Sequence, residues 1–235
     1  MSVFLVGGGP DVETEDLLEP FRTEVGQRAP GRTHGVAAVL FDEDGTAERF
    51  LPAYASILVG VPLTVVKVGP GHTVDPAVFD GADGILVGGG PTPDYHAGLI
   101  ECAPAIKAAV DAGVPYLGFS AGAMIAGETA LLGGYRLGGR EVCPQEWCED
   151  LDDVTLSSGL GLVPFVVDVH AAQAGTIGRA LAIVESGAAE MTAAIDEDTC
   201  LVVPVGAPAS TGRVRGSGSV WLVRRTESVT VTSWL

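Results

Sequence analysis

Basic residues are scarce in this chain of 235 residues. Lysine and arginine together number 13, against 30 aspartates and glutamates, and the formal net charge is −17. Only Lys67 and Lys107 are lysines. Nucleic acids and anionic membranes are bound through a basic field, so we expect neither as a partner. Apolar residues make up 47% of the chain, which excludes a disordered acidic protein because there is enough material for a core.

Long apolar runs are also missing. A membrane-spanning helix needs roughly 20 consecutive apolar residues, and no run approaches that length. Residues 1–7, MSVFLVG, have neither the basic start nor the long apolar stretch of a secretory signal peptide. We therefore expect a cytoplasmic protein.

Cysteine and histidine number four each, and neither residue type forms a metal-binding pattern. Cys143 and Cys148 are one loose pair, whereas a structural zinc site usually needs two close pairs. The HExxH motif is absent. We expect four free thiols, no metal and no cofactor.

Short runs of Val, Ile and Leu alternate with longer segments that have helical spacing. Such runs, apolar throughout rather than alternating with polar residues, are typical of parallel strands covered on both faces. The sequence predicts one α/β domain over residues 1–235, with a doubly wound, mostly parallel sheet. Its predicted strands are residues 3–6, 36–41, 63–68, 84–87 and 115–119. The predicted helices are residues 13–27, 47–59, 103–112 and one that starts near residue 121.

The pattern changes after residue 132. Residues 133–154 are rich in glycine, proline and acidic side chains, and we interpret them as a long excursion, a feature that is usually functional or mobile. Strands are then predicted at 161–167, 193–195 and 200–205, with a helix near 175–184. Residues 219–224 and 228–234 alternate like an antiparallel hairpin at the edge of the sheet.

Residues 118–122, G-F-S-A-G, fit the pattern G-x-S-x-G. The motif follows a predicted strand and precedes a predicted helix, which is the setting of a nucleophile elbow. Ser120 is therefore the candidate nucleophile, at a helix start whose free N–H groups favour developing negative charge. The alternative is a glycine-rich turn with an inactive serine.

A serine hydroxyl needs a base to take its proton. His170 is the first candidate, because it follows an apolar run at the carboxyl end of a strand, where open α/β sheets bind ligands. His96, just beyond a glycine-rich loop, is the second. His34 and His72 lie in polar turns and are expected at the surface.

The base needs an acid to orient it, and the residues alone leave the choice open between Asp168 and the later group Asp196, Glu197 and Asp198. The GGG loop at residues 88–90 ends a strand upstream of the elbow. There Gly89 or Gly90, with the N–H of Ala121, would form an oxyanion hole. A phosphate-binding loop is not favoured, because G-x-x-x-x-G-K-[ST] and G-x-G-x-x-G are both absent.

The order of these motifs is informative. GGG, GFSAGA (118–123), GLGLVP (159–164), DVH (168–170), GR (178–179) and IDEDT (195–199) together resemble the cyanophycinase and aspartyl dipeptidase (dipeptidase E) family of serine peptidases. The resemblance runs from residue 84 to about residue 203. It implies a class I glutamine amidotransferase-like, flavodoxin-like fold and a triad of Ser120, His170 and Glu197. It also implies a small peptide or amide substrate.

The sequence departs from this family where relatives bind an acidic substrate. The family follows D-x-H with an aromatic residue and then R-x-R-x-x-R. Here Ala171 replaces the aromatic residue, Ala174 and Thr176 replace the first two arginines, and Arg179 alone remains as a candidate substrate-binding residue. Neither alanine nor threonine can make the bidentate contact of arginine with a carboxylate. Pro91 replaces the usual polar residue after the glycine loop.

We therefore expect an amide hydrolase with diverged specificity, and that arginine at position 176 would restore turnover of aspartyl peptides if the pocket is otherwise that of the family. Acyl transfer or ester hydrolysis on the same fold, and a non-catalytic binding domain, remain the alternatives. A glutaminase is not favoured because its elbow carries cysteine. The acidic cluster Glu149, Asp150, Asp152 and Asp153 is expected to be solvated rather than to select a cationic substrate, and a homodimer is left open.

Overall fold

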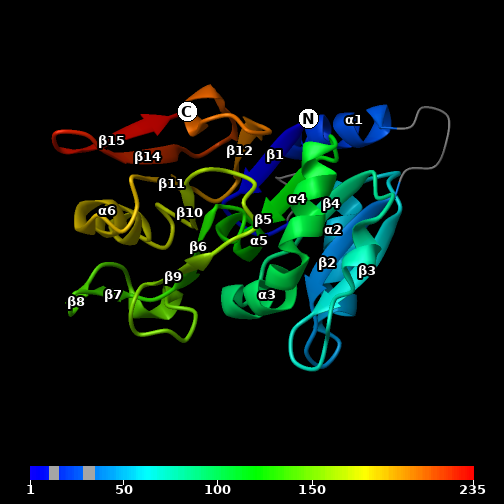
Figure 1. Ribbon diagram of the computed structural model, residues 1–235, viewed down its shortest axis with the longest axis horizontal. Helices are drawn as coiled ribbons and strands as arrows, with labels where there is room; N and C mark the ends of the chain where they lie inside the picture. The colour runs from blue at the N-terminus through cyan, green and yellow to red at the C-terminus, as the bar shows by residue number, and fades with distance from the viewer. Residues whose placement is uncertain (11–15, 29–34) are drawn as a thin grey trace.

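A seven-stranded sheet forms the centre of the computed structural model, which describes residues 1–10, 16–28 and 35–235. The strand order is β13-β12-β1-β5-β4-β2-β3 (Figure 1). Neighbouring strands in the stretch β1-β5-β4-β2-β3 pair in parallel, whereas β12 pairs antiparallel with both β1 and β13. Their bounds are β1 Ser2–Val6, β2 Val36–Phe41, β3 Leu63–Val68, β4 Gly84–Val87, β5 Tyr116–Phe119, β12 Thr199–Pro204 and β13 Arg213–Gly216.

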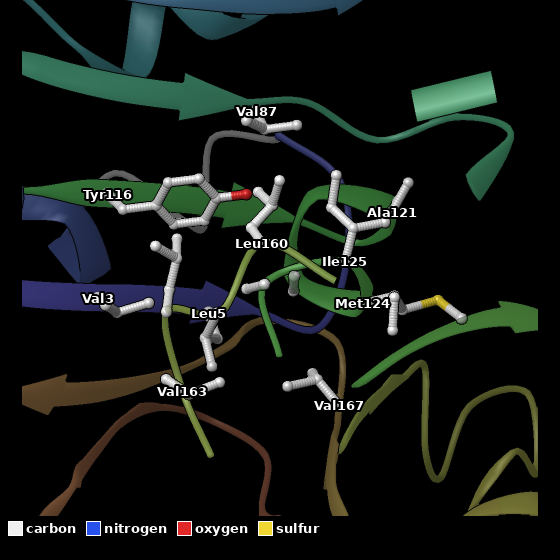
Figure 2. Packing of buried hydrophobic residues seen from close by; sticks show 14 of the residues in the cluster. Val3, Leu5, Val87, Tyr116, Ala121, Met124, Ile125, Leu160, Val163 and Val167 are labelled. Atoms are coloured by element: carbon white, nitrogen blue, oxygen red, sulfur yellow. The ribbon is translucent and has the colours of Figure 1, made fainter. Parts of the chain in front are cut away.

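Both faces of this sheet are buried, which is why its strands are apolar without alternation. Ile85 and Val87 of β4 face one core, which includes α3, α4 and α5, while Leu86 between them faces a second core with α1 and α2. Figure 2 shows the first core, where Val3 and Leu5 lie near Tyr116 and Ile125. The doubly wound α/β fold expected from the sequence is confirmed.

Helices join the strands on both faces. Their bounds are α1 Glu19–Gln27, α2 Thr46–Ile57, α3 Thr92–Leu99, α4 Ala103–Asp111, α5 Ala121–Met124 and α6 Ile177–Ser186. Short 3-10 turns occupy Asp16–Leu18, Pro76–Phe79, Ile100–Cys102, Gln145–Trp147 and Ala209–Thr211. Helix α3 was not predicted, because its sequence TPDYHAGL carries an early proline and a glycine that mask its helical spacing. The predicted start of α1 at residue 13 lies outside the described residues.

A second sheet of four strands lies beside the first, in the order β10-β11-β14-β15. Its members are β10 Val166–Val169, β11 Met191–Ile195, β14 Val220–Arg225 and β15 Val229–Trp234. The predicted C-terminal hairpin is confirmed as β14–β15, but it pairs with β11 in this sheet and not at the edge of the central one. Figure 1 shows the hairpin and α6 at one end of the molecule and β2 and β3 at the other. The strand predicted at 161–167 begins later, at Val166.

The excursion after the elbow is ordered by two small sheets. In one, β6 Thr129–Gly133 pairs with β9 Thr155–Ser158, and in the other β7 Arg136–Leu137 pairs with β8 Arg140–Glu141. Residues 142–154 then turn back along residues 134–136, where Gly134 and Tyr135 donate to the carbonyls of Cys148 and Asp152. Across the described residues, no helix has both the length and the apolar character to cross a membrane.

The contact between β4, β5 and α5 requires glycine. A Cβ on Gly122 would lie 2.3 Å from the carbonyl oxygen of Val87, and one on Gly118 would lie 2.5 Å from the Gly122 carbonyl. Both neighbours are backbone atoms and cannot rotate away. The close approach of helix to strand therefore fixes the turn that carries Ser120.

Gly122→Ala should destabilise the fold by about 3 kcal/mol, because overpacking against backbone forces the strand and helix apart. Urea denaturation measures the change. Gly26→Ala is the matched control: its Cβ meets nothing within 4 Å in α1, so it should be neutral or stabilise by up to about 1 kcal/mol. Equal stability of the two variants would contradict this account of the turn.

Candidate active site

Ser120 lies on the sharp turn between β5 and α5. Its backbone has φ 46° and ψ −107°, a conformation that L-residues rarely adopt. The turn is held by the Ser120 N–H, which donates to the carbonyl of Val6 on β1 at 3.0 Å. In this geometry the hydroxyl projects outward beyond the carboxyl end of β5, as the elbow motif predicts.

His170 follows the last residue of β10, in the second sheet. Its N–H donates to the carbonyl of Gly7 at 3.0 Å, and its own φ is 56°. The imidazole Nε2 lies 3.0 Å from Ser120 Oγ, which is hydrogen-bonding distance. The first-choice histidine is thus brought to the serine across the boundary between the two sheets.

Glu197 lies in the turn that links β11 to β12, and this turn passes from the second sheet to the first. Its Oε1 lies 2.7 Å from His170 Nδ1. The Glu197 N–H donates to Gln173 Oε1 at 3.0 Å, so the turn is also tied to the loop after His170. Ser120, His170 and Glu197 form one hydrogen-bonded chain.

The other acids considered for this position have different partners. Asp196 is buried, and its carboxylate accepts hydrogen bonds from the N–H groups of Ala172 and Ser219 and from Trp221 Nε1, at 2.8–3.0 Å. It cannot also orient His170. The Asp198 carbonyl accepts from the Ser217 N–H, which ties the same turn to the residue that follows β13.

Asp168 was the earlier alternative, and the structure places it elsewhere. It is fully buried and forms a forked ion pair with Arg179, with Nη2 2.6 Å and Nε 2.9 Å from the two carboxylate oxygens. Arg179 Nη1 also donates to the carbonyls of Gly134 and Trp147, at 3.1 and 3.0 Å. Arg179 is only 2% exposed. The expectation that it binds substrate is therefore corrected: its donors are occupied in holding residues of the excursion.

The positions of the two missing arginines are also buried. Thr176 is 1% exposed and its hydroxyl donates to the Val169 carbonyl, and Ala174 is 5% exposed. Ala171 packs with Ala180 and Ala194 in a small cluster beneath α6. An arginine at position 176 would have to enter this packed region, so the expected rescue by Thr176→Arg does not fit the surroundings of that side chain.

His96 and His72 have partners other than Ser120. His96 Nε2 is bonded to the carbonyl of Ser158 at 2.8 Å, so the second-choice base serves the β9 strand instead. His72 Nε2 lies 3.5 Å from Asp42, and His34 lies outside the described residues. All four cysteines are free thiols, and the described residues contain no cluster of His, Cys, Asp and Glu fit to hold a metal ion.

Two buried tyrosines form hydrogen bonds with the glycine loop beside Ser120. The N–H of Gly89 donates to the Tyr54 hydroxyl at 2.9 Å, and the Tyr95 hydroxyl donates to the Gly89 carbonyl at 3.3 Å. Burial raises the pKa of Tyr54 to about 12, so its hydroxyl stays neutral at physiological pH. Because the Gly89 N–H is occupied, Gly90 is the residue of the pair whose N–H is left for an oxyanion, together with Ala121 at the start of α5. Gly90 has φ +148°, a value suited to glycine.

The excursion, interpreted from its sequence as a functional or mobile segment, lies against His170 and next to the glycine loop. The Trp147 ring lies 4.8 Å from the His170 ring, centroid to centroid, at an angle of 36°. Glu149 accepts hydrogen bonds from the hydroxyl and the N–H of Thr92, at 2.9 and 3.2 Å, next to the glycine loop. Burial raises the pKa of Glu149. Asp150, Asp152 and Asp153 are exposed, so only Glu149 departs from the solvated cluster that was expected.

A cavity of about 420 Å³ opens beside Ser120 and His170. It extends between the glycine loop and α2, and its walls are mostly apolar. Its lining residues are Gly9, Pro10, Leu40, Phe41, Thr46, Ala47, Phe50, Tyr54, Gly89, Gly90, Pro91, Tyr95, Ser120 and His170.

Known proteins resemble this chain in sequence pattern and in fold. The family model described as Peptidase family S51 matches residues 36–206. A solved peptidase from an acI-B1 Actinobacterium has a TM-score of 0.71 at 16% identity, over 98% of this chain and 93% of that one. A putative Peptidase E protein from Listeria monocytogenes EGD-e has a TM-score of 0.57 at 16% identity, over 92% and 98%. No curated protein matches the chain.

Arg179→Ala should destabilise the protein by about 3–5 kcal/mol, because it leaves the Asp168 carboxylate buried without its partner. Chemical denaturation measures this loss. Arg140→Ala is the control. Arg140 forms an exposed ion pair with Glu185 at 3.5 Å, and such surface pairs contribute little, so its loss should change stability by less than about 1 kcal/mol. A stable Arg179→Ala protein that merely binds substrate more weakly would return Arg179 to the substrate site.

Proposed function

The chain belongs to peptidase family S51, and from that premise we propose that it is a serine hydrolase that cleaves an amide bond in a small peptide. The observation that carries the proposal is the continuous hydrogen-bonded chain from Ser120 Oγ through His170 to Glu197, with distances of 3.0 and 2.7 Å. Ser120 and His170 line a cavity of about 420 Å³, which is large enough for a small organic ligand.

In the proposed reaction, Ser120 Oγ attacks the carbonyl carbon of the scissile amide. His170 Nε2 accepts the hydroxyl proton as the new C–O bond forms, and then donates it to the leaving nitrogen as the C–N bond breaks. Glu197 accepts a hydrogen bond from the Nδ1–H of His170. This bond holds the imidazole in the required tautomer and stabilises its charged form. An acyl-enzyme on Ser120 results.

Water completes the cycle. His170 takes a proton from a water molecule, whose oxygen attacks the acyl carbon, and the proton passes to Ser120 as the acid product leaves. The negative oxygen that forms in both steps would be bound by the N–H groups of Gly90 and Ala121. These are backbone donors fixed before the reaction, so they need not reorganise as charge develops.

Three other functions are compatible with the same structural setting. Acyl transfer would use the same acyl-enzyme with an amine or alcohol in place of water, and an esterase would differ only in the leaving group. A binding domain would retain the elbow without reacting. The hydrogen bond from the serine to the imidazole favours a reactive serine over an inactive one, because it is the contact that activates a hydroxyl for attack.

Labelling by a fluorophosphonate probe should be specific for Ser120. We expect wild type to be labelled, Ser120→Ala not at all, and His170→Ala and Glu197→Gln far more slowly. For Glu197→Gln the loss should approach about 10⁴-fold, as when the acid of a serine triad is replaced by its amide. Gel fluorescence and intact mass measure the adduct.

Ser56→Ala serves as the control because Ser56 is an exposed serine of α2, and its loss should leave labelling unchanged. Equal labelling of wild type and Ser120→Ala would contradict the enzymatic proposal and favour the binding domain. Release of a free acid from a peptide, rather than its transfer to an added amine, distinguishes hydrolysis from acyl transfer.

Trp147→Ala should slow labelling by up to about tenfold, because the indole ring restricts the orientation of the imidazole and such ring contacts contribute about 0.5–1.5 kcal/mol. Trp147 is 38% exposed, so its removal also loses buried apolar area, and labelling is measured at a temperature where the variant is fully folded. Trp147→Phe retains a ring and should recover most of the rate. A rate for Trp147→Ala equal to that of wild type would show that the ring has no part in positioning His170.

A further inference from the structure

The cavity beside Ser120 has an apolar floor and walls. Leu40 and Phe41 contribute from the end of β2, and Ala47 and Phe50 from the first turns of α2. Pro10 and Pro91, from the loops after β1 and β4, complete the lining on the side of the proposed nucleophile. These elements are far apart in the sequence and meet only at the carboxyl ends of the parallel strands.

The described lining residues include no aspartate, glutamate, lysine or arginine. Thr46 Oγ1 donates to the Glu43 carbonyl at 2.6 Å and accepts from Arg49 at 3.1 Å. The Tyr95 hydroxyl accepts from the Phe41 N–H at 2.8 Å and donates to the Gly89 carbonyl. A carboxylate or ammonium group among these lining side chains would therefore lose its hydration without a carboxylate, lysine or arginine of the lining to pair with, which is costly. The nearby cation Arg49 is exposed and lies outside the lining, with its guanidinium carbon 5.5 Å from the centre of the Phe50 ring.

Phe50 stands out on this surface. It is 50% exposed although its neighbours in the cavity lining, Leu40, Ala47 and Tyr54, are buried. An aromatic ring at the rim of an apolar cavity, next to a proposed nucleophile, is a surface that a bound apolar group would cover.

A second observation argues against the acidic substrate of the resembled family. Arg179, the one arginine retained from its substrate-binding motif, is occupied by Asp168 and by two carbonyls, and the positions of the other two are filled by buried small side chains. Neither the described cavity lining nor the motif provides a lysine or arginine for an aspartyl carboxylate inside the cavity.

We propose that the substrate class of this site is peptides with a bulky apolar side chain, such as Phe, Tyr, Leu or Met, adjacent to the scissile bond, and that Phe50 is a specificity-determining residue. The proposal rests on the proposed hydrolase function and deepens it. The side chain would occupy the cavity between Phe41, Phe50 and Tyr54, and the scissile carbonyl would lie at Ser120.

Two series of short peptides, in which Phe, Leu, Ala, Asp or Lys is placed on either side of one bond, test the substrate class by mass spectrometry of the products. We expect kcat/KM for Phe and Leu to exceed that for Asp and Lys by at least about 100-fold in one series, since charged groups gain no partner in the cavity. Faster cleavage of the Asp or Lys peptides would overturn the proposal.

The variant Phe50→Arg tests the residue. It should lower kcat/KM for the Phe peptide by about tenfold or more and raise it for the Asp peptide, because the new guanidinium removes apolar contact and supplies a counter-charge. Val59→Arg is the matched control: Val59 is 64% exposed, lies just beyond the end of α2 and does not line the cavity, so the same charge there should change neither value. Equal behaviour of the two variants would overturn the role of Phe50.

Fluorophosphonate labelling of Ser120 separates the two levels of failure. Labelled protein that prefers Asp or Lys peptides overturns the apolar substrate class and leaves the hydrolase function standing. Absence of labelling and of cleavage overturns both. Labelled protein that prefers Phe and Leu, with the preference altered by Phe50→Arg alone, supports both.

Discussion

The rest of the site depends on the hydrogen bonds that the buried carboxylate of Asp196 accepts. Its three hydrogen bonds tie the turn between β11 and β12 to Ala172, just after His170, and to Ser219 and Trp221 at the start of β14. This turn is where the chain crosses from the second sheet to the first. Because the serine belongs to one sheet and the histidine to the other, the position of the turn determines whether the two meet. A buried carboxylate with three donors is stable only in one geometry, which limits how the sheets can shift.

Backbone packing at the same junction is equally restrictive. The Gly7 N–H donates to the Thr199 carbonyl while its own carbonyl accepts from His170, and a Cβ on Gly7 would lie 2.1 Å from the carbonyl oxygen of Asp196. On the other side, the Arg179–Asp168 pair and the Glu149–Thr92 contact hold the excursion so that Trp147 lies against His170. The proposed base is thus positioned from its backbone and from its ring face.

This division of tasks explains how specificity can diverge while the arrangement of Ser120, His170 and Glu197 is retained. The serine is held by β1, β5 and α5, and the histidine and glutamate by the second sheet and the excursion, whereas the cavity is lined largely by the ends of β2 and β4 and by α2. Substitutions in α2 alter the cavity without disturbing Asp196 or Arg179. A chain can therefore lose contacts for an acidic substrate and keep the geometry needed for reaction at a carbonyl.

Local patterns in the sequence determined the parallel strands, the elbow at Ser120 and the approximate extent of the C-terminal hairpin, because burial on both faces and a strained turn restrict the residue types at each position. Sequence spacing could not choose between Asp196 and Glu197, which differ only in the direction their side chains take from one turn. The family resemblance assigned Arg179 to substrate binding, because a motif does not reveal burial. Those choices, the sheet to which the hairpin belongs and the apolar cavity were decided by tertiary structure, because each depends on contacts between segments that are distant in the chain.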